Sequence, residues 1–180
     1  MFPKIIDKAL RLSLLSQQHA QPLFELTERN RAFLKPWFPW VEFTNREKDT
    51  EKFIEDQEKL YRDKKAMQIV VEYENKIIGM TDYHEIDLEN EVGRIGYWLG
   101  EEFNGNGFMT SVVREMISIG FNEIKLNRIE IQCATINTKS RAIPERLGFI
   151  QEGILRSSEK VNGRFLDHAV YGLLKDDIDL

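Results

Sequence analysis

Hydrophobic and polar positions alternate with a period of two near the start of the chain. Leu10, Leu12 and Leu14 are separated by polar residues, and this pattern predicts a strand with one buried face. Two helices are expected next, because apolar residues recur at helical spacing among charged ones. The first follows Pro22, and the second runs from about 49 to 65 with a predicted apolar stripe of Phe53, Ile54, Leu60 and Tyr61.

The middle of the chain returns to a period of two and predicts three neighbouring antiparallel strands. The first two, 67–73 and 77–86, form a hairpin across a polar turn, and the third spans 92–99. From 110 to 125 the apolar residues recur every three or four positions, which predicts a helix.

A strand and a short helix are expected after this helix. Ile129, Ile131 and Cys133 alternate with polar residues as in a strand. Residues 137–147 are predicted to form a helix that ends at Gly148, because glycine tolerates the left-handed conformation of a terminal turn.

The end of the chain predicts a hairpin. Residues 149–161 and 164–174 should pair across Asn162-Gly163, the dipeptide that a type I′ turn favours. The order of all predicted elements indicates one mixed α/β layer structure, so we expect residues 1–180 to form a single domain.

The composition excludes several classes of function. The 180 residues include 30 Asp plus Glu against 25 Lys plus Arg, a net charge of −5, so the chain has no general attraction for nucleic acid. A single cysteine, Cys133, and three scattered histidines predict neither an internal disulfide nor a metal site. No apolar run approaches the ~20 residues that cross a bilayer, and the start lacks a signal-peptide pattern, so we expect a cytoplasmic protein without a membrane partner.

A segment between the first two predicted helices is unusually rich in aromatic residues. We expect a stiff loop over residues 33–43, because Pro36 and Pro39 fix the backbone there. Its rings, including Trp37 and Trp40, either fill the core or a contact with a second copy of the chain, or line a substrate pocket. If the rings form a contact with a second copy of the chain, the protein is a homo-oligomer. The sequence leaves the packing interpretation and the pocket interpretation both open.

A glycine-containing stretch joins the strand at 92–99 to the helix at 110–125. Gly105 and Gly107 allow a tight turn and let a ligand approach the backbone amides. The first N–H groups of a helix have no partner within it and lie at its positive end, so a diphosphate fits there. Thr110 replaces the third glycine of a dinucleotide fingerprint and no Gly-Lys-Ser/Thr follows, so nucleotide hydrolysis is disfavoured. A plain turn is the alternative interpretation.

Two motifs follow one another in the second half of the chain. They are Asn104-Gly105-Asn106-Gly107-Phe108-Met109 and Asn137-x-x-Ser140, the latter leading to Leu147-Gly148-Phe149. Together they resemble the pyrophosphate loop and the following motif of the GNAT superfamily of acyl-CoA-dependent N-acetyltransferases, in particular its Rim-type branch. The resemblance spans most of the chain and includes the aromatic segment and the closing hairpin. It implies a central, mostly antiparallel twisted sheet of about seven strands flanked by about four helices, with splayed central strands at the acyl-CoA site.

Three positions depart from the family pattern. Asn104 stands where Gln or Arg is usual, and Met109 stands where a small residue is usual. Neither change removes the backbone N–H groups that would supply most contacts with an anion. Pro144 stands where many members have a tyrosine acid. Because proline has no N–H, the Ser140 carbonyl loses its usual donor, and the helix should be irregular there.

The resemblance implies direct attack of an amine on acetyl-CoA in a ternary complex, without a metal. It makes the Leu99 amide the donor to the oxyanion, Ser140 the acid for the leaving thiolate and Glu159 the base. Strand alternation predicts Glu159 on an apolar side with Leu155, where desolvation would raise its pKa. Glu85 and a water chain are the alternatives for the base.

The motifs and the aromatic segment define the expected contact residues. Cys133 is an alternative nucleophile, but its alternation with apolar residues indicates burial. The residues expected to contact the acceptor are Trp37, Trp40, Tyr83 and Glu85. Those expected to contact acetyl-CoA are Trp98, Leu99, Asn104, Gly105, Asn106, Gly107, Phe108, Met109, Thr110, Asn137 and Ser140.

Three functions stay open at this point. The resemblance implies acetyl transfer to the N-terminal α-amino group of a protein, a ribosomal protein in the Rim-type branch. A small amine such as a polyamine or an aminoglycoside is the second candidate acceptor, because an acidic chain suits a cationic molecule. A non-catalytic acyl-CoA-binding module is the third interpretation.

Overall fold

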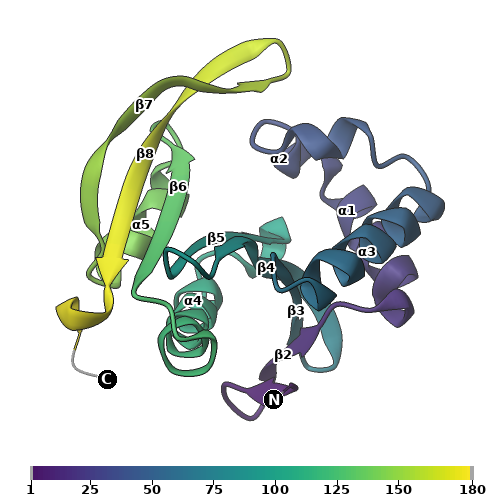
Figure 1. Ribbon diagram of the computed structural model, residues 1–180. Helices are drawn as coiled ribbons and strands as arrows, with labels where there is room; N and C mark the ends of the chain where they lie inside the picture. Colours follow the sequence, from purple (N-terminus) through teal and green to yellow (C-terminus); the bar gives the residue numbers. More distant parts are fainter. Residues whose placement is uncertain (1, 179–180) are drawn as a thin grey trace.

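One mixed sheet organises the chain. The computed structural model describes residues 2–178, and its strands lie in the order β1-β2-β3-β4-β5-β6-β8-β7 (Figure 1). Neighbouring strands are antiparallel except for β5 and β6, which are parallel. The strands are β1 (Lys4–Ile5), β2 (Leu10–Leu14), β3 (Met67–Tyr73), β4 (Lys76–Asp87), β5 (Val92–Leu99), β6 (Arg128–Ala134), β7 (Ile150–Val161) and β8 (Arg164–Leu174).

Helices cover both faces of the sheet. On one face, α1 and α3 pack against β3 and β4, and on the other α4 and α5 lie under β5 and β6 (Figure 1). A π-helical segment, Ile119–Ile124, continues α4. The α-helices are α1 (Ala20–Arg29), α2 (Arg31–Leu34), α3 (Glu47–Arg62), α4 (Phe108–Ser118) and α5 (Thr138–Arg146).

The pairing of β5 with β6 ends part-way along both strands. The register runs from Val92↔Arg128 to Ile95↔Ile131, after which the two strands diverge (Figure 1). Beyond that point β5 continues to Leu99 beside β4, and β6 continues beside β8. The sheet is therefore open between β5 and β6 at the end where α4 begins, as the family resemblance implied.

The main core lies between the sheet and α4. Apolar side chains of α4 recur at helical spacing and are buried, because that face of the helix rests on the sheet. The Tyr83 hydroxyl donates to the Met116 carbonyl at 2.9 Å. At Gly120, in the π-helical segment, an added Cβ would lie 2.1 Å from the Tyr83 hydroxyl oxygen, so only glycine fits beside this side chain.

Several elements differ from the sequence-based prediction. An eighth strand, β1, precedes β2. The aromatic segment begins within the last residues of the short helix α2 and contains a 3₁₀ turn, Pro39–Glu42, so it is not a plain loop. On α3, Ile54 is buried, but Phe53 and Tyr61 are 37% and 41% exposed. The buried stripe of α3 is narrower than predicted because, within residues 2–178, the helix packs mainly against α1, β3 and the 3₁₀ turn Gln17–His19.

The predicted turns are confirmed. Asn162 and Gly163 have φ values of 49° and 78°, and Gly148 after α5 has 85°, all in the left-handed region. Within residues 2–178 the structure has no helix that is both long and apolar enough to cross a membrane.

Candidate active site

The loop between β5 and α4 begins the candidate site. Gly105 and Gly107 have φ values of 84° and 78°, and Gly107 directly precedes the first residue of α4. A Cβ at either glycine would meet nothing within 4 Å, so the space beside the backbone is open. The loop therefore presents the unpaired N–H groups of the α4 N-terminus to a space that can hold an anion.

Hydrogen bonds between asparagine side chains and the backbone stabilise this loop. Asn104 Nδ2 donates to the Gly100 carbonyl at 2.8 Å, and the Glu101 N–H donates to Asn30 Oδ1 at 2.8 Å. Asn106 Nδ2 lies 3.3 Å from the Phe103 carbonyl. Asn104 thus stabilises the loop by a hydrogen bond from its side chain to a backbone carbonyl of the same loop.

The residues that open α4 take different positions. Met109 is buried in the core, and the Phe108 ring lies 4.7 Å from the Tyr73 ring, so both side chains pack inward. Thr110 Oγ1 accepts a hydrogen bond at 2.9 Å from Arg146 at the end of α5. This contact brings a guanidinium to the first turn of α4.

Leu99 ends β5 beside the open part of the sheet. The Gly100 N–H donates to the Ile78 carbonyl at 2.8 Å, toward β4. Successive amides of an antiparallel strand point to opposite sides, so the Leu99 N–H points toward β6, beyond the last β5–β6 pair. The Trp98 side chain lies on the other face, with its ring 5.8 Å from Trp40, so only its backbone faces α4.

Three side chains meet across the opening between β5 and β6. They are Tyr97 on β5, Cys133 on β6 and Ser140 on α5. The Tyr97 hydroxyl donates to the Ser140 carbonyl at 2.9 Å, and Ser140 Oγ lies 3.4 Å from the Tyr97 oxygen. Asn137 Oδ1 accepts from the Ser140 N–H at 3.2 Å and caps the helix. The sequence interpretation singled out Ser140 and Asn137 but missed Tyr97.

Burial decides the chemistry of Cys133 and Tyr97. Burial raises the pKa of the Cys133 thiol to about 11, a shift opposed by the Ser140 hydroxyl. Burial also raises the pKa of Tyr97 well above its usual value. Both groups therefore remain protonated near neutral pH, and Cys133 is a buried thiol as its alternation indicated.

The surroundings of Glu159 differ from the prediction. Between Leu155 and Glu159 the β7–β8 register shifts, with Leu155 opposite His168 and Glu159 opposite Leu166. Two extra residues of β7 bulge out between these pairs, so Leu155 and Glu159 still share a side of the strand, but Leu155 is 46% exposed rather than buried. The predicted apolar environment of Glu159 is therefore wrong. Instead, Glu159 Oε2 lies 3.3 Å from His168 Nε2, close enough for an ion pair although not aligned as a hydrogen bond.

Comparison with known proteins assigns the family. The family model of the acetyltransferase (GNAT) domain matches residues 9–150. The chain belongs to this family. It is 36% identical over 177 residues to the putative ribosomal N-acetyltransferase YdaF of Bacillus subtilis, covering 97% of this chain and 96% of that protein.

Solved structures agree with this assignment to the GNAT acetyltransferases. The microcin C7 self-immunity acetyltransferase MccE, in complex with acetyl-CoA and AMP, has a TM-score of 0.89 and 30% identity, covering 94% of each chain. The ribosomal L7/L12 α-N-protein acetyltransferase RimL, in complex with coenzyme A, has a TM-score of 0.94 at 24% identity, covering 98% of this chain and all of that chain (100%). The latter likeness shows the shared fold.

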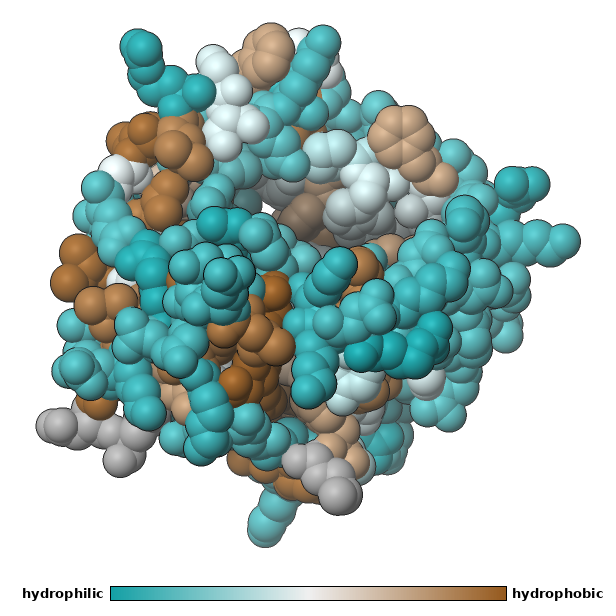
Figure 2. Space-filling view, in the orientation of Figure 1, coloured by the Kyte–Doolittle hydropathy of each residue, from teal (hydrophilic) through white to brown (hydrophobic). Residues whose placement is uncertain are grey.

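The aromatic segment of this GNAT acetyltransferase packs against the closing hairpin. Trp37 contacts a small buried cluster formed by Ala134, Val161 and Leu166, and Asn162 Nδ2 donates to the Lys35 carbonyl at 2.7 Å. The far end of the hairpin thus reaches α2 (Figure 1). Figure 2 shows the surface hollowed between the hairpin and the segment around α2.

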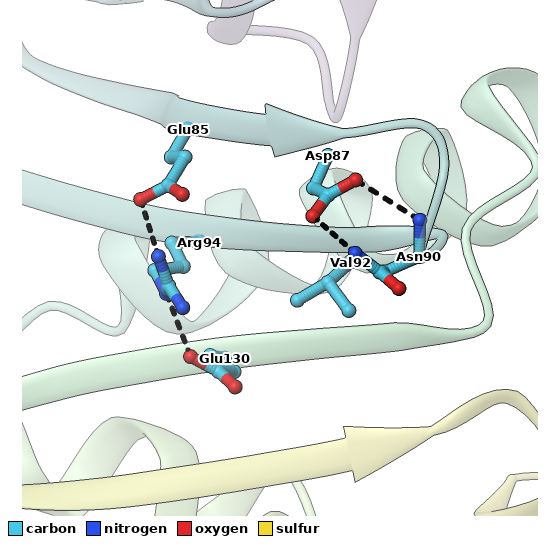
Figure 3. Close-up of a pocket in the computed structure, with 6 residues that line it drawn as sticks. All are labelled: Glu85, Asp87, Asn90, Val92, Arg94 and Glu130. Carbon is cyan, nitrogen blue, oxygen red and sulfur yellow. Dashed lines mark hydrogen bonds and ion pairs between the residues drawn. The ribbon is translucent and has the colours of Figure 1, made fainter.

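Two predicted acceptor contacts of the acetyltransferase are contradicted. Tyr83 is 0% exposed and its hydroxyl is bonded to the Met116 carbonyl of α4, so it belongs to the core. Glu85 forms an ion pair with Arg94, in the half of β5 that is still paired with β6. It lines a cavity of about 250 Å³ with Asp87, Asn90, Val92, Arg94 and Glu130, at the opposite end of β5 from Leu99 (Figure 3).

The described part of the acetyltransferase contains no group of His, Cys, Asp and Glu side chains that could hold a metal ion.

Proposed function

We propose that this GNAT enzyme transfers the acetyl group of acetyl-CoA to the N-terminal α-amino group of a protein, with a ribosomal protein as acceptor. The observation that carries the proposal is the pair of elements beside the opening of the sheet: the glycine loop before α4 and Ser140 on α5. The names of YdaF and RimL support the choice of acceptor. We propose further that residues 1–180 act as one domain and that the reaction takes place in the cytoplasm.

The binding of acetyl-CoA rests on backbone groups in this proposal. The amides of Gly105, Asn106, Gly107 and the first turn of α4 hold the diphosphate, because they combine free N–H donors with the positive end of the helix dipole. Arg146, which is bonded to Thr110, adds positive charge to the same turn. MccE and RimL, each solved with acetyl-CoA or coenzyme A, support this part of the proposal.

Three groups share the proposed chemistry. The acceptor nitrogen attacks the thioester carbon, a C–N bond forms, and the carbonyl oxygen gains negative charge that the Leu99 N–H stabilises. When the C–S bond breaks, the thiolate takes a proton from Ser140 Oγ. Glu159, paired with His168, takes the first proton from the acceptor ammonium before attack. The second proton leaves the nitrogen as the amide forms and returns through water to Ser140 Oγ, which restores the hydroxyl. The buried thiol of Cys133 takes no covalent part.

The acceptor reaches the opening from the face opposite α4. Trp37 and Trp40 line its approach, because the aromatic segment and the hairpin flank the hollow on that face (Figure 2). Both rings are half-buried, so they combine packing within the chain with a surface for the acceptor.

The experiment measures coenzyme A release from acetyl-CoA with a panel of acceptors. The panel contains peptides from ribosomal protein N-termini, the same peptides with a blocked α-amine, and polyamines. We expect turnover with free peptides only, and mass spectrometry should locate the acetyl group on the α-nitrogen. Turnover with polyamines alone would make the enzyme a small-amine acetyltransferase. Binding of coenzyme A without turnover on any acceptor would favour a non-catalytic module.

A further inference from the structure

Pro144 leaves a gap in the hydrogen bonds of α5. In an α-helix the carbonyl of residue i accepts from the N–H of residue i+4, and proline has no N–H. The Ser140 carbonyl therefore has no helical donor from position 144. An unpaired carbonyl in a half-buried turn is costly, so this position needs a donor from elsewhere.

The phenol of Tyr97 supplies that donor. Its hydroxyl donates to the Ser140 carbonyl at 2.9 Å, from a strand that lies 43 residues earlier in the chain. Together with the bond from the Ser140 N–H to Asn137 Oδ1, both backbone polar groups of Ser140 are held by side chains. The N–H and the carbonyl of Ser140 are thus bonded to Asn137 and Tyr97 rather than to other backbone groups of the helix.

The same hydroxyl also touches the Ser140 side chain. Ser140 Oγ lies 3.4 Å from the Tyr97 oxygen, at the long end of the hydrogen-bond range. A donor held this loosely can turn toward another acceptor at little cost. Burial keeps Tyr97 protonated, because it raises the pKa of the phenol, so the bond to the carbonyl persists across the working pH range.

The Tyr97 bond also spans the open part of the sheet. The β5–β6 ladder ends at Ile95↔Ile131, two residues before Tyr97. Leu99 lies two residues after Tyr97 on the same strand, whereas Ser140 lies on α5. The bond therefore joins the element that carries the proposed oxyanion donor to the element that carries the proposed acid, at a point where backbone pairing no longer does so.

We propose that Tyr97 is a positioning residue for Ser140: its hydroxyl takes the place of the N–H that Pro144 lacks, and so fixes the distance of the Ser140 hydroxyl from the Leu99 amide. This inference rests on the proposed function of Ser140 as the acid. It assigns to Tyr97 a role that is exerted through Ser140.

Tyr97→Phe tests the inference, because it removes the hydroxyl and keeps the ring. We expect kcat to fall by about tenfold or more, since a shift of ~1 Å in a reacting group costs up to 10²-fold, while KM for acetyl-CoA and the affinity for coenzyme A stay unchanged. Adding Pro144→Ala restores a backbone N–H for the Ser140 carbonyl. The double variant Tyr97→Phe with Pro144→Ala should therefore recover a large part of the lost kcat. Pro144→Ala alone should keep the kcat of the wild type.

Tyr83→Phe is the matched control. Tyr83 also donates from a phenol to a helix carbonyl at 2.9 Å, but to Met116 on α4. It should lower thermal stability as Tyr97→Phe does and leave kcat unchanged. A merely structural role for Tyr97 would give the same result for both variants.

The remaining outcomes separate this inference from the proposed function. If the wild type is active and Ser140→Ala is impaired, an unchanged kcat in Tyr97→Phe overturns the inference alone. The inference also fails if Pro144→Ala does not restore the kcat lost in Tyr97→Phe and the kcat losses of Tyr97→Phe and Ser140→Ala add in full when the two are combined. If Ser140→Ala is as active as the wild type, or the wild type transfers acetyl to no acceptor, the role of Ser140 and the inference fail together.

Discussion

Gly107→Ala probes the glycine loop and has a matched control in the same chain. Gly107 precedes α4, and Gly163 lies in the β7–β8 turn. Both have a φ of 78°, and at both an added Cβ would meet nothing within 4 Å. The two substitutions thus impose the same backbone strain without a clash, and only Gly107 lies beside the proposed diphosphate site.

The expected magnitudes follow from this geometry. An alanine in the left-handed region costs about 1–2 kcal/mol, so both variants should lose a similar amount of stability. For a chain of this size about 1 kcal/mol lowers Tm by roughly 2–4 °C. At Gly107 the methyl group also enters the space where the diphosphate would lie. Losing one charge-assisted hydrogen bond of about 1.5–3 kcal/mol weakens coenzyme A binding by about ten- to a hundredfold.

Calorimetry checks both halves of this prediction. Scanning calorimetry should give the same Tm shift for Gly107→Ala and Gly163→Ala, and titration with coenzyme A should give a weaker Kd for Gly107→Ala alone. If both variants bind coenzyme A as tightly as the wild type, the loop does not hold the diphosphate. A weaker Kd in both would mean that the strain itself, and not the position, causes the loss.

Three further predictions concern the reacting groups. Ser140→Ala should lower kcat by about 10²–10⁴-fold and leave the calorimetric affinity for coenzyme A unchanged; wild-type turnover would exclude Ser140 as the acid. Glu159→Gln should move the acidic limb of the pH–rate profile, and an unmoved limb would leave a water chain as the base. Because burial raises the pKa of Cys133 to about 11, its thiolate fraction at about pH 8 is about a hundredfold below that of an ordinary thiol, and alkylation followed by mass spectrometry should be correspondingly slow. Isolation of an acetylated enzyme would contradict this.

The sequence predicted most of the fold because its signals are local. The Asn162-Gly163 turn, the helix after Asn137 and the loop at Gly105 and Gly107 each depend on the conformational preferences of a few neighbouring residues. The structure has each of these where the sequence indicated. The short strand β1 was missed because two residues carry no periodic pattern.

The errors arise where pairing between distant segments decides. Alternation predicted an apolar, buried side for Glu159. Leu155 and Glu159 do share a side, because two extra residues of β7 bulge out between them, but that side is partly exposed, and this depends on how the hairpin packs. Tyr83 and Glu85 were assigned to the acceptor from their strand alone. The assembled sheet determines which face of that strand packs on α4. It also determines that Arg94 pairs with Glu85.

Two departures from the family pattern have a common explanation in this structure. Asn104 cannot extend to an anion as Gln or Arg could, and it bonds instead to the Gly100 carbonyl, which fixes the loop before any ligand binds. Positive charge then comes from another element, Arg146 of α5, through Thr110. In the same way, Pro144 removes a donor from α5 and Tyr97 of β5 replaces it. In both places a neighbouring element takes over the missing contact, so the position of α5 relative to β5 and α4 should control both the cosubstrate loop and Ser140.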